Sequence, residues 1–379
     1  QWFIELYRKF NLSFMIFNED YCLSLEQEGQ KTNPFLEHQL GILSMDFLKS
    51  KKRQTQVFQA PWDMLVIDEA HHITDDENSY GFIKSLARKV FGLMLLTATP
   101  EQMGVKNHFL HLKLLDPERY FDFNNYLNET ARYKKTIKKI HELVKKGKTI
   151  DHILDSYGPG RVIFRNKRSV VKGFPKRVAR LKSLRANPSQ IKAANQEFIK
   201  DIRICDFKDD PRISYLVELI KQKKKLLVIC SSKEKVKAID KAVAKHISLD
   251  VARFDETMSL LQRDRNAAWF SRKDGAKMLI CSEIGSEGRN FQFVHHLFLF
   301  DLPLNPELLE QRIGRVDRIG QKKKIKIHVP YLKTSMYEIL ARWYMEGLNL
   351  FEKNINGVHL IYKKFEKNLS NFLNSTFVL

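Results

Sequence analysis

Short apolar runs, separated by stretches of helical periodicity, constrain the fold of this chain most strongly. Each run ends at polar residues, as expected of buried strands in a parallel sheet whose two faces are covered by helices. The runs are QLGILS (39–44), MLVIDE (64–69), LMLLTA (93–98), LLVICS (226–231), VARF (251–254), KMLICS (277–282), HLFLFD (296–301) and IKIHVP (325–330). We therefore predict an α/β fold with parallel sheets flanked by helices.

The runs fall into two groups, which predicts two sheet-based domains. The first group lies in residues 1–116 and the second in residues 209–334. The intervening residues 117–208 are basic, helical in places and broken by Gly-Pro and Phe-Pro turns, so we expect a linker or insertion there. Residues 335–379 carry an apolar stripe that predicts a helical C-terminal extension.

The charge of the chain is strongly positive and uneven. The net charge is +21, and residues 132–200 hold 20 Lys and Arg against four acids, which places +16 of the total in that stretch. A polyanion is the expected partner, because neutralised phosphates release condensed counterions. The alternative is a solvated, lysine-rich surface.

Composition argues against two other classes of protein. No apolar run approaches the ~20 residues that a membrane-spanning helix needs, so we expect no membrane partner. The four cysteines form no Cys-x-x-Cys pair, and two of them stand inside apolar runs. We expect buried thiols in a reducing cytoplasm and neither zinc ligands nor disulfides.

An acid pair follows the second apolar run in the sequence VIDEAHH, at residues 66–72. Ligands of α/β sheets gather at the carboxyl ends of parallel strands, so a nucleotide would lie here. Phosphoanhydride hydrolysis needs Mg²⁺ and an oriented water molecule, and Asp68 and Glu69 can divide these tasks. Two hydroxyls, Thr97 and Thr99, follow the next strand; a purely structural role in a turn is the simpler interpretation of them.

A second set of charged residues lies near the end of the second group of strands. Asn305 and Pro306 predict a helix start. On one continuous helix, Gln311, Arg315 and Arg318 would share a face and meet an anion, as arginine fingers do. A surface helix with salt bridges is the alternative.

A glycine-containing loop at residues 283–290 could also contact an anion. Gly285 and Gly288 let backbone amides approach closely, and Arg289 and Asn290 offer donors. The sequence GKT at residues 147–149 is not a P-loop, because Glu142 stands where that motif requires glycine, and the chain contains no other GxxxxGK[ST].

The order DEAH, TAT, LVIC, SEGRNF and QRIGRVDRIGQ resembles the Swi/Snf branch of the superfamily 2 translocases. Within that branch, IDEAHH, LLTATPEQ, FRNKRSVVKGFPKR, CSEIGSEGRNFQF, LLEQRIGRVDRIGQ and ARWYMEGLNLFE are similar to bacterial RNA polymerase-associated members. The resemblance implies two RecA-like lobes, ATP with Mg²⁺ between them, and double-stranded DNA across both. It also implies RNA polymerase as a partner.

Residue roles in the first lobe are implied by this resemblance. Asp68 matches the acid that holds Mg²⁺ through water, and Glu69 matches the acid that orients the attacking water. His71, Thr97 and Thr99 match residues that couple hydrolysis to lobe movement.

The second lobe also has implied roles. Arg315 and Arg318 match the arginine fingers, Gln311 a nucleotide-sensing glutamine, and Gly288 a residue beside the nucleotide. Contacts to nucleic acid are implied for Ser44, Arg289, Asn290, Arg165, Arg168 and Lys172.

The resemblance leads to a functional expectation with two alternatives. We expect the complete protein to be a cytoplasmic, nucleoid-associated ATP hydrolase that moves along duplex DNA and recycles RNA polymerase during transcription. In the family, a P-loop precedes the Gln-Trp at which this sequence starts, so we expect a first lobe without its N-terminal strands. The alternatives are a truncated, catalytically inactive remnant that binds nucleic acid or polymerase and, third, a DEAH-type RNA helicase.

Overall fold

The computed structural model contains two compact units. Residues 1–165 belong to the first unit and residues 166–379 to the second. The described residues are 2–27, 33–73, 77–97, 104–131, 173–200, 206–222, 224–283, 291–355 and 362.

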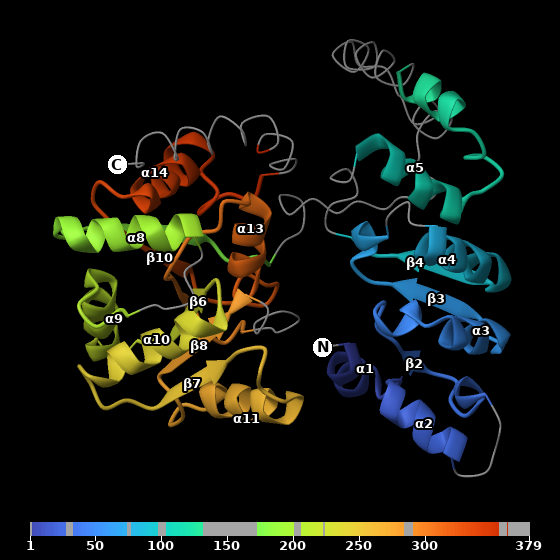
Figure 1. Cartoon of the computed structure of the whole chain (residues 1–379), viewed down its shortest axis with the longest axis horizontal. Helices are drawn as coiled ribbons and strands as arrows, with labels where there is room; N and C mark the ends of the chain where they lie inside the picture. Colours follow the sequence, from blue (N-terminus) through green and yellow to red (C-terminus); the bar gives the residue numbers. More distant parts are fainter. Residues whose placement is uncertain are drawn as a thin grey trace. The chain divides into compact units, whose positions relative to one another are not determined.

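The first unit alternates short strands with helices. Its two parallel ladders in the described part pair β1 with β2 and β3 with β4 (Figure 1). In chain order its elements are α1 (Trp2–Phe10), β1 (Met15–Ile16), α2 (Glu19–Gln27), η1 (Pro34–Leu36), β2 (Gly41–Ile42), η2 (Phe47–Lys49), α3 (Lys51–Gln59), β3 (Met64–Ile67), η3 (Ala70–His72), α4 (Glu77–Lys89), β4 (Gly92–Leu95) and α5 (Gly104–Leu115).

A buried arginine joins α2 to α3 in this unit. The guanidinium of Arg53 has no exposed surface and lies 2.5 Å from Glu19 Oε1 and 2.6 Å from Glu26 Oε1. Arg53 therefore satisfies its charge within the fold while the apolar side of α3 packs beside Phe17 and Phe35.

The second unit is built on one six-stranded sheet, in the order β5-β10-β9-β6-β8-β7, and each strand pairs with its neighbours in parallel. Hydrophobic clusters cover both of its faces, which explains why β6 and β8 are buried at every residue. The strands are β5 (Arg177–Leu184), β6 (Leu226–Cys230), β7 (Val251–Phe254), β8 (Met278–Ser282), β9 (His296–Leu299) and β10 (Ile325–Leu332).

The helices of this unit begin at clear capping residues. Asp210 and Asn305 each accept a hydrogen bond from a backbone N–H of the first turn, and Ser259 forms a capping box with Gln262. The helices are α8 (Pro188–Lys200), α9 (Pro211–Lys221), α10 (Lys233–Ala244), α11 (Leu260–Ser271), α13 (Pro306–Gly314), α14 (Met336–Arg342) and the π-helix η5 (Trp343–Gly347).

The predicted α/β class, with two RecA-like lobes of parallel strands flanked by helices, is confirmed. The predicted helix start at Asn305-Pro306 is confirmed as well. Three of the four cysteines are buried free thiols, as predicted; Cys205 lies outside the described residues. Within the described residues, no helix is both long and apolar enough to cross a membrane.

The structure differs from the sequence interpretation in how much chain the second unit includes. Strand β5 and helix α8 come from the stretch that was assigned to a basic linker, yet β5 pairs along its whole length with β10. Arg180 and Lys182 are exposed, which is possible because β5 is an edge strand. The C-terminal segment also enters the core, where Leu340, Tyr344 and Phe351 are fully buried.

Candidate nucleotide site and its supporting charge network

The acid pair lies at the carboxyl end of β3, as the sequence predicted. The backbone N–H of Leu96 donates to the carbonyl of Ile67 at 2.8 Å, and the N–H of Ala70 donates to the carbonyl of Leu96 at 2.8 Å. These two bonds bring the loop after β3 against the end of β4. Glu69 adopts φ 49° and ψ 45°, a left-handed conformation that is uncommon for a non-glycine residue and is concentrated at functional sites.

His71 connects the acid pair to the end of β4. Its Nδ1 lies 3.3 Å from the hydroxyl of Thr97 and 3.2 Å from Oε2 of Glu69. One imidazole is therefore in reach of a carboxylate and of a hydroxyl on the neighbouring strand. The structure thus brings together three residues that sequence reasoning could only align by motif.

The carboxylate of Asp68 has two donors of its own. Oδ1 accepts from the backbone N–H of Glu69 at 2.9 Å, and Oδ2 accepts from the indole Nε1 of Trp2 at 2.7 Å. Sequence reasoning did not find the Trp2 contact, and only the resemblance of Gln1-Trp2 to a family motif hinted that this residue belongs near the site.

The donor set suits Mg²⁺ bound mainly by phosphate and water. Among the residues the structure describes, no group of three or more His, Cys, Asp or Glu side chains could form a protein cage for a metal. Mg²⁺ in phosphoryl-transfer sites typically uses one or two carboxylates together with waters and phosphate oxygens. Asp68 would be that carboxylate, and the cation would offset phosphate charge.

In the second unit, the predicted helical face of Gln311, Arg315 and Arg318 is wrong in part. Helix α13 ends at Gly314, Arg315 is its C-cap, and Arg318 lies in the non-helical segment beyond it. The last turn tightens through a bond from the N–H of Arg315 to the carbonyl of Arg312 at 3.3 Å. A glycine at the helix end weakens continuation of the α-helix, which contributes to this early stop.

The two candidate fingers are half-buried and Gln311 is exposed. The Nε of Arg318 is buried and makes no hydrogen bond to any residue that the structure describes, a state that a bound anion would relieve. The carbonyl of Arg315 accepts from the N–H of Phe291 at 2.8 Å, which fixes the finger segment to the chain that follows the glycine-containing loop. The amide of Gln321 closes the segment by donating to the carbonyl of Val294 at 3.0 Å.

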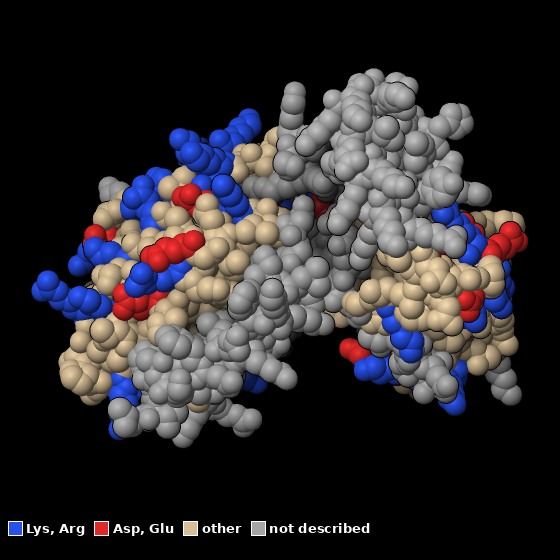
Figure 2. Space-filling model, turned by 90° about the horizontal axis from the view of Figure 1, so that it is seen from above, with Lys and Arg blue, Asp and Glu red and all other residues tan. Residues whose placement is uncertain are grey.

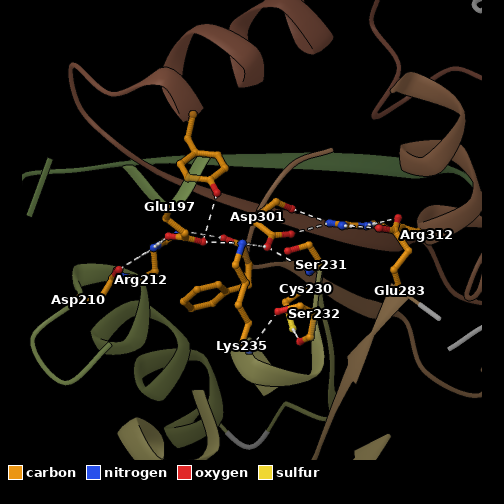
Figure 3. A network of polar contacts seen from close by, with 12 residues as sticks. Glu197, Asp210, Arg212, Cys230, Ser231, Ser232, Lys235, Glu283, Asp301 and Arg312 are labelled. Carbon is orange, nitrogen blue, oxygen red and sulfur yellow. Dashed lines mark hydrogen bonds and ion pairs between the residues drawn. The ribbon is translucent and has the colours of Figure 1, made fainter. Parts of the chain in front are cut away.

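In the second unit, a chain of alternating charges lies at the carboxyl ends of β8 and β9 (Figure 3). Figure 3 shows its members converging from α8, α9, α10, α13 and the ends of β8 and β9. Oppositely charged neighbours lie 2.7–3.1 Å apart along the sequence of contacts Asp210, Arg212, Glu197, Lys235, Asp301, Arg312 and Glu283.

Within this chain, Asp301 stays ionised although it is buried. Burial alone would raise the pKa of its carboxyl, but Lys235 and Arg312 outweigh that effect and hold the pKa of Asp301 well below its usual range. Conversely, Asp301 and Glu283 overcome the effect of burial and raise the pKa of Arg312. Asp301 and Arg312 are therefore both charged at neutral pH.

Sequence reasoning missed Arg312 as a structural residue. It is 2% exposed, and its guanidinium joins Asp301, at the end of β9, to Glu283, which directly follows β8. The signal was present, because Leu309, Arg312, Ile313 and Val316 follow helical spacing and all are buried. Arg312 therefore sets the position of α13 relative to the chain leading into residues 284–290.

The remaining predicted site residues are only partly described. Ser44 is exposed, and its hydroxyl accepts from the N–H of Phe47 at 3.1 Å, so it caps a turn. The other members lie outside the described residues: Thr99, Gly288, Arg289, Asn290, Arg165, Arg168 and Lys172.

Comparison with known proteins identifies the class. The model of the SNF2-related domain matches residues 1–251, that of the helicase conserved C-terminal domain matches residues 211–320, and that of the RNA polymerase recycling family C-terminal region matches residues 324–377. The chain belongs to the SNF2-related family and carries the domains of a helicase-family ATPase. Its C-terminal match makes it a RapA-like member of the Swi/Snf branch.

Two solved structures are similar to this chain. The Sulfolobus solfataricus SWI2/SNF2 ATPase core in complex with dsDNA is 18% identical, with a TM-score of 0.38 over 97% of this chain and 82% of that one. The C-terminal part of the Fun30 ATPase domain is also 18% identical, with a TM-score of 0.35 over 49% of this chain and 60% of that one.

Proposed function

We propose that the complete protein is an ATP-dependent translocase on double-stranded DNA that acts in RNA polymerase recycling. The observation that carries the proposal is the position of His71, within 3.3 Å of both the Glu69 carboxylate and the Thr97 hydroxyl. A change in what Glu69 contacts can pass through this imidazole to the end of the neighbouring strand. Coupling of hydrolysis to movement requires such a connection.

Each charged residue then has a distinct task. Asp68 would hold Mg²⁺, which would offset phosphate charge when bound, and Glu69 would orient the water that attacks the terminal phosphate. Arg315 and Arg318 neutralise charge that develops on the transferred phosphoryl group, an effect worth ~10³–10⁵ in rate for arginine fingers.

Substitution of Glu69 by Gln tests the catalytic assignment. DNA-stimulated phosphate release by the full natural gene product should fall by at least ~10²-fold, since general-base and water-positioning groups contribute on that order. Glu37→Gln, at an exposed glutamate of the same unit, is the matched control and should leave the rate unchanged. Unchanged hydrolysis in Glu69→Gln would refute the assignment.

The choice of stimulating nucleic acid separates DNA translocation from RNA helicase activity. We expect duplex DNA to raise the hydrolysis rate more than duplex RNA of the same length. A stronger response to RNA would favour the RNA helicase alternative.

Binding to duplex DNA should depend on salt and not on sequence. Figure 2 shows Lys and Arg side chains over the described surface with fewer Asp and Glu among them, in keeping with the net charge of +21. For a protein that neutralises phosphates, the logarithm of the binding constant falls linearly with the logarithm of the salt concentration. Affinity that stays flat between 50 and 200 mM salt would contradict this mode of binding.

The polymerase partnership rests on the C-terminal match at residues 324–377. We expect the natural gene product to co-purify with RNA polymerase core enzyme mixed with it in vitro. Deleting residues 362–379 should weaken this association if the matched region forms part of the contact.

A second candidate function follows from the contact between Trp2 and Asp68. The indole Nε1 lies 2.7 Å from the carboxylate oxygen that a hydrated cation would approach. This arrangement favours a chain that binds nucleic acid or polymerase without hydrolysing ATP by itself. Millimolar ATP with Mg²⁺ would then leave its melting temperature unchanged, whereas a saturable rise would exclude this alternative.

A further inference from the structure

A second buried ion cluster, separate from the charge chain of Figure 3, surrounds the segment that carries the two candidate fingers. At its centre is Arg177, the first residue of β5, which is 3% exposed. Its Nε donates to Asp317 Oδ2 at 2.6 Å, while Nη1 and Nη2 donate to the two carboxylate oxygens of Glu310 at 2.9 Å each. The fork of one guanidinium therefore joins an acid on α13 to an acid beyond its end.

The two acids lie on either side of Arg315 in the sequence, and the second of them adjoins Arg318. Glu310 precedes Arg315 on α13, and Asp317 stands directly before Arg318. With both acids held by one planar group, the chain between them has little freedom.

The chain on either side of Arg177 reinforces the arrangement. The N–H of Gly320 donates to the carbonyl of Gly173 at 3.3 Å, and both glycines have left-handed φ values, 93° and 100°. The N–H of Ile325 donates to the carbonyl of Lys176 at 2.9 Å. The start of β5 thus lies against the whole segment from Asp317 to β10.

The C-terminal segment joins the same cluster. Nη1 of Arg177 also donates to the carbonyl of Leu350 at 3.3 Å, and Nδ2 of Asn354 donates to Glu310 Oε2 at 2.9 Å. Both residues belong to the region that matches the RNA polymerase recycling family. The finger segment and that region therefore share one buried arginine.

We propose that Arg177 is a positioning residue for phosphoryl transfer, which holds Arg315 and Arg318 in place by clamping Glu310 and Asp317. The proposal rests on the proposed function, because it assumes that these arginines act on the nucleotide. Lysine cannot replace Arg177, since a single ammonium cannot serve both carboxylates in fork geometry.

The test is a double-mutant cycle in the full natural gene product. Arg177→Met should lower the kcat of DNA-stimulated ATP hydrolysis at least ~10-fold with the KM for ATP changed less than ~3-fold, the pattern of an interaction made in the transition state. In an Arg315→Ala/Arg318→Ala background, Arg177→Met should cause no further loss, because it acts through these two arginines. Arg253→Met, which removes an exposed arginine from an ion pair with Asp240, is the matched control.

Three results would overturn the proposal. One is a kcat within twofold of wild type in a folded Arg177→Met protein. Another is a loss that multiplies with that of the Arg315→Ala/Arg318→Ala pair, which would indicate general destabilisation. If Arg177→Met fails to fold, Asp317→Asn replaces it, because asparagine keeps the shape of the side chain. The third overturning result is then a kcat within twofold of wild type in Asp317→Asn.

A further measurement does not need hydrolysis. Amide hydrogen exchange in residues 311–321 should accelerate in Arg177→Met while β8 keeps its protection, and unchanged exchange there would also overturn the proposal. If instead Arg315→Ala leaves hydrolysis intact, the proposed function fails, while faster exchange in residues 311–321 would still support Arg177 as the residue that holds this segment.

Discussion

Replacing Asp301 by asparagine should destabilise the second unit strongly. The carboxylate is 3% exposed and accepts three hydrogen bonds, at 2.7 Å from Lys235 Nζ, 2.9 Å from Arg312 Nη1 and 3.1 Å from the N–H of Ser231. Asparagine keeps the shape but removes the charge, so two buried cations lose their shared counter-ion. Removing one partner of a buried ion pair costs ~3–5 kcal/mol.

Urea titration followed by hydrogen exchange and mass spectrometry can measure this cost separately in each unit. With an m value of about 2 kcal/mol per M, a loss of about 4 kcal/mol lowers the urea midpoint of peptides from β6 and β9 by roughly 2 M. Peptides of the first unit should keep their midpoint. Asp240→Asn is the control, because its pair with Arg253 is largely exposed and such pairs contribute ~0–1 kcal/mol.

The effect of pH provides a second check on the same residue. The pKa of Asp301 is lowered in the folded state, so the stabilisation is complete above the pKa of an unfolded aspartate and is lost as pH falls through the folded value. The difference between wild type and Asp301→Asn should be constant from pH 6 to 8 and shrink below about pH 4. A midpoint no lower than that of Asp240→Asn would refute the argument that this network bears on stability.

Substitutions at one buried histidine and at two glycines test burial and backbone packing. Burial, followed by Lys224 and other nearby cations, lowers the pKa of His328 to about 4. The unfolded state then binds more protons between about pH 6.5 and 4, so the second unit should lose on the order of 2 kcal/mol between pH 7 and 5 from this residue. The urea midpoint of the second unit should therefore fall less between pH 7 and 5 in His328→Gln than in wild type. His246→Gln, which replaces an exposed histidine, is the control and should show the same fall as wild type. A Cβ at Gly275 would lie 1.8 Å from a backbone oxygen, so Gly275→Ala should lower the free energy of unfolding of the second unit by ~1–3 kcal/mol and reduce its urea midpoint. Gly81 lies inside α4 with open space around it, so Gly81→Ala should raise the free energy of unfolding of the first unit by up to ~1 kcal/mol. Equal midpoints for Gly275→Ala and wild type would contradict the packing argument.

Much of the fold was predictable because its signals are local. Strands β6 and β8 match the apolar runs within a residue at each end, since a fully buried strand needs apolar residues on both faces. Helix starts at Asn305 and Ser259 follow from side chains that cap the first turn. The acid pair at the end of β3 could likewise be placed, because strand ends meet at one edge of a parallel sheet.

Strand β5 could not be predicted in the same way. Three of the eight residues in its sequence, RVARLKSL, are charged, so it gives little apolar signal. It becomes a strand because β10, about 150 residues later in the sequence, pairs with it from Arg177 to Leu184. Strand propensity depends on such cross-strand and packing partners more than on the residues themselves.

In the candidate site, too, some features follow from the sequence alone and others depend on tertiary contacts. By itself, the sequence determined which chemical groups exist and which strand ends carry them: Asp68 and Glu69 after one strand, two arginines after a later helix. Only the tertiary structure decided how those groups are held. It ended α13 at Gly314, placed Arg318 beyond the helix and gave Glu310 and Asp317 to Arg177, 133 and 140 residues away. The physical reason is that a charge inside a fold must find its partner in space, and sequence neighbours do not reveal which residue that partner is.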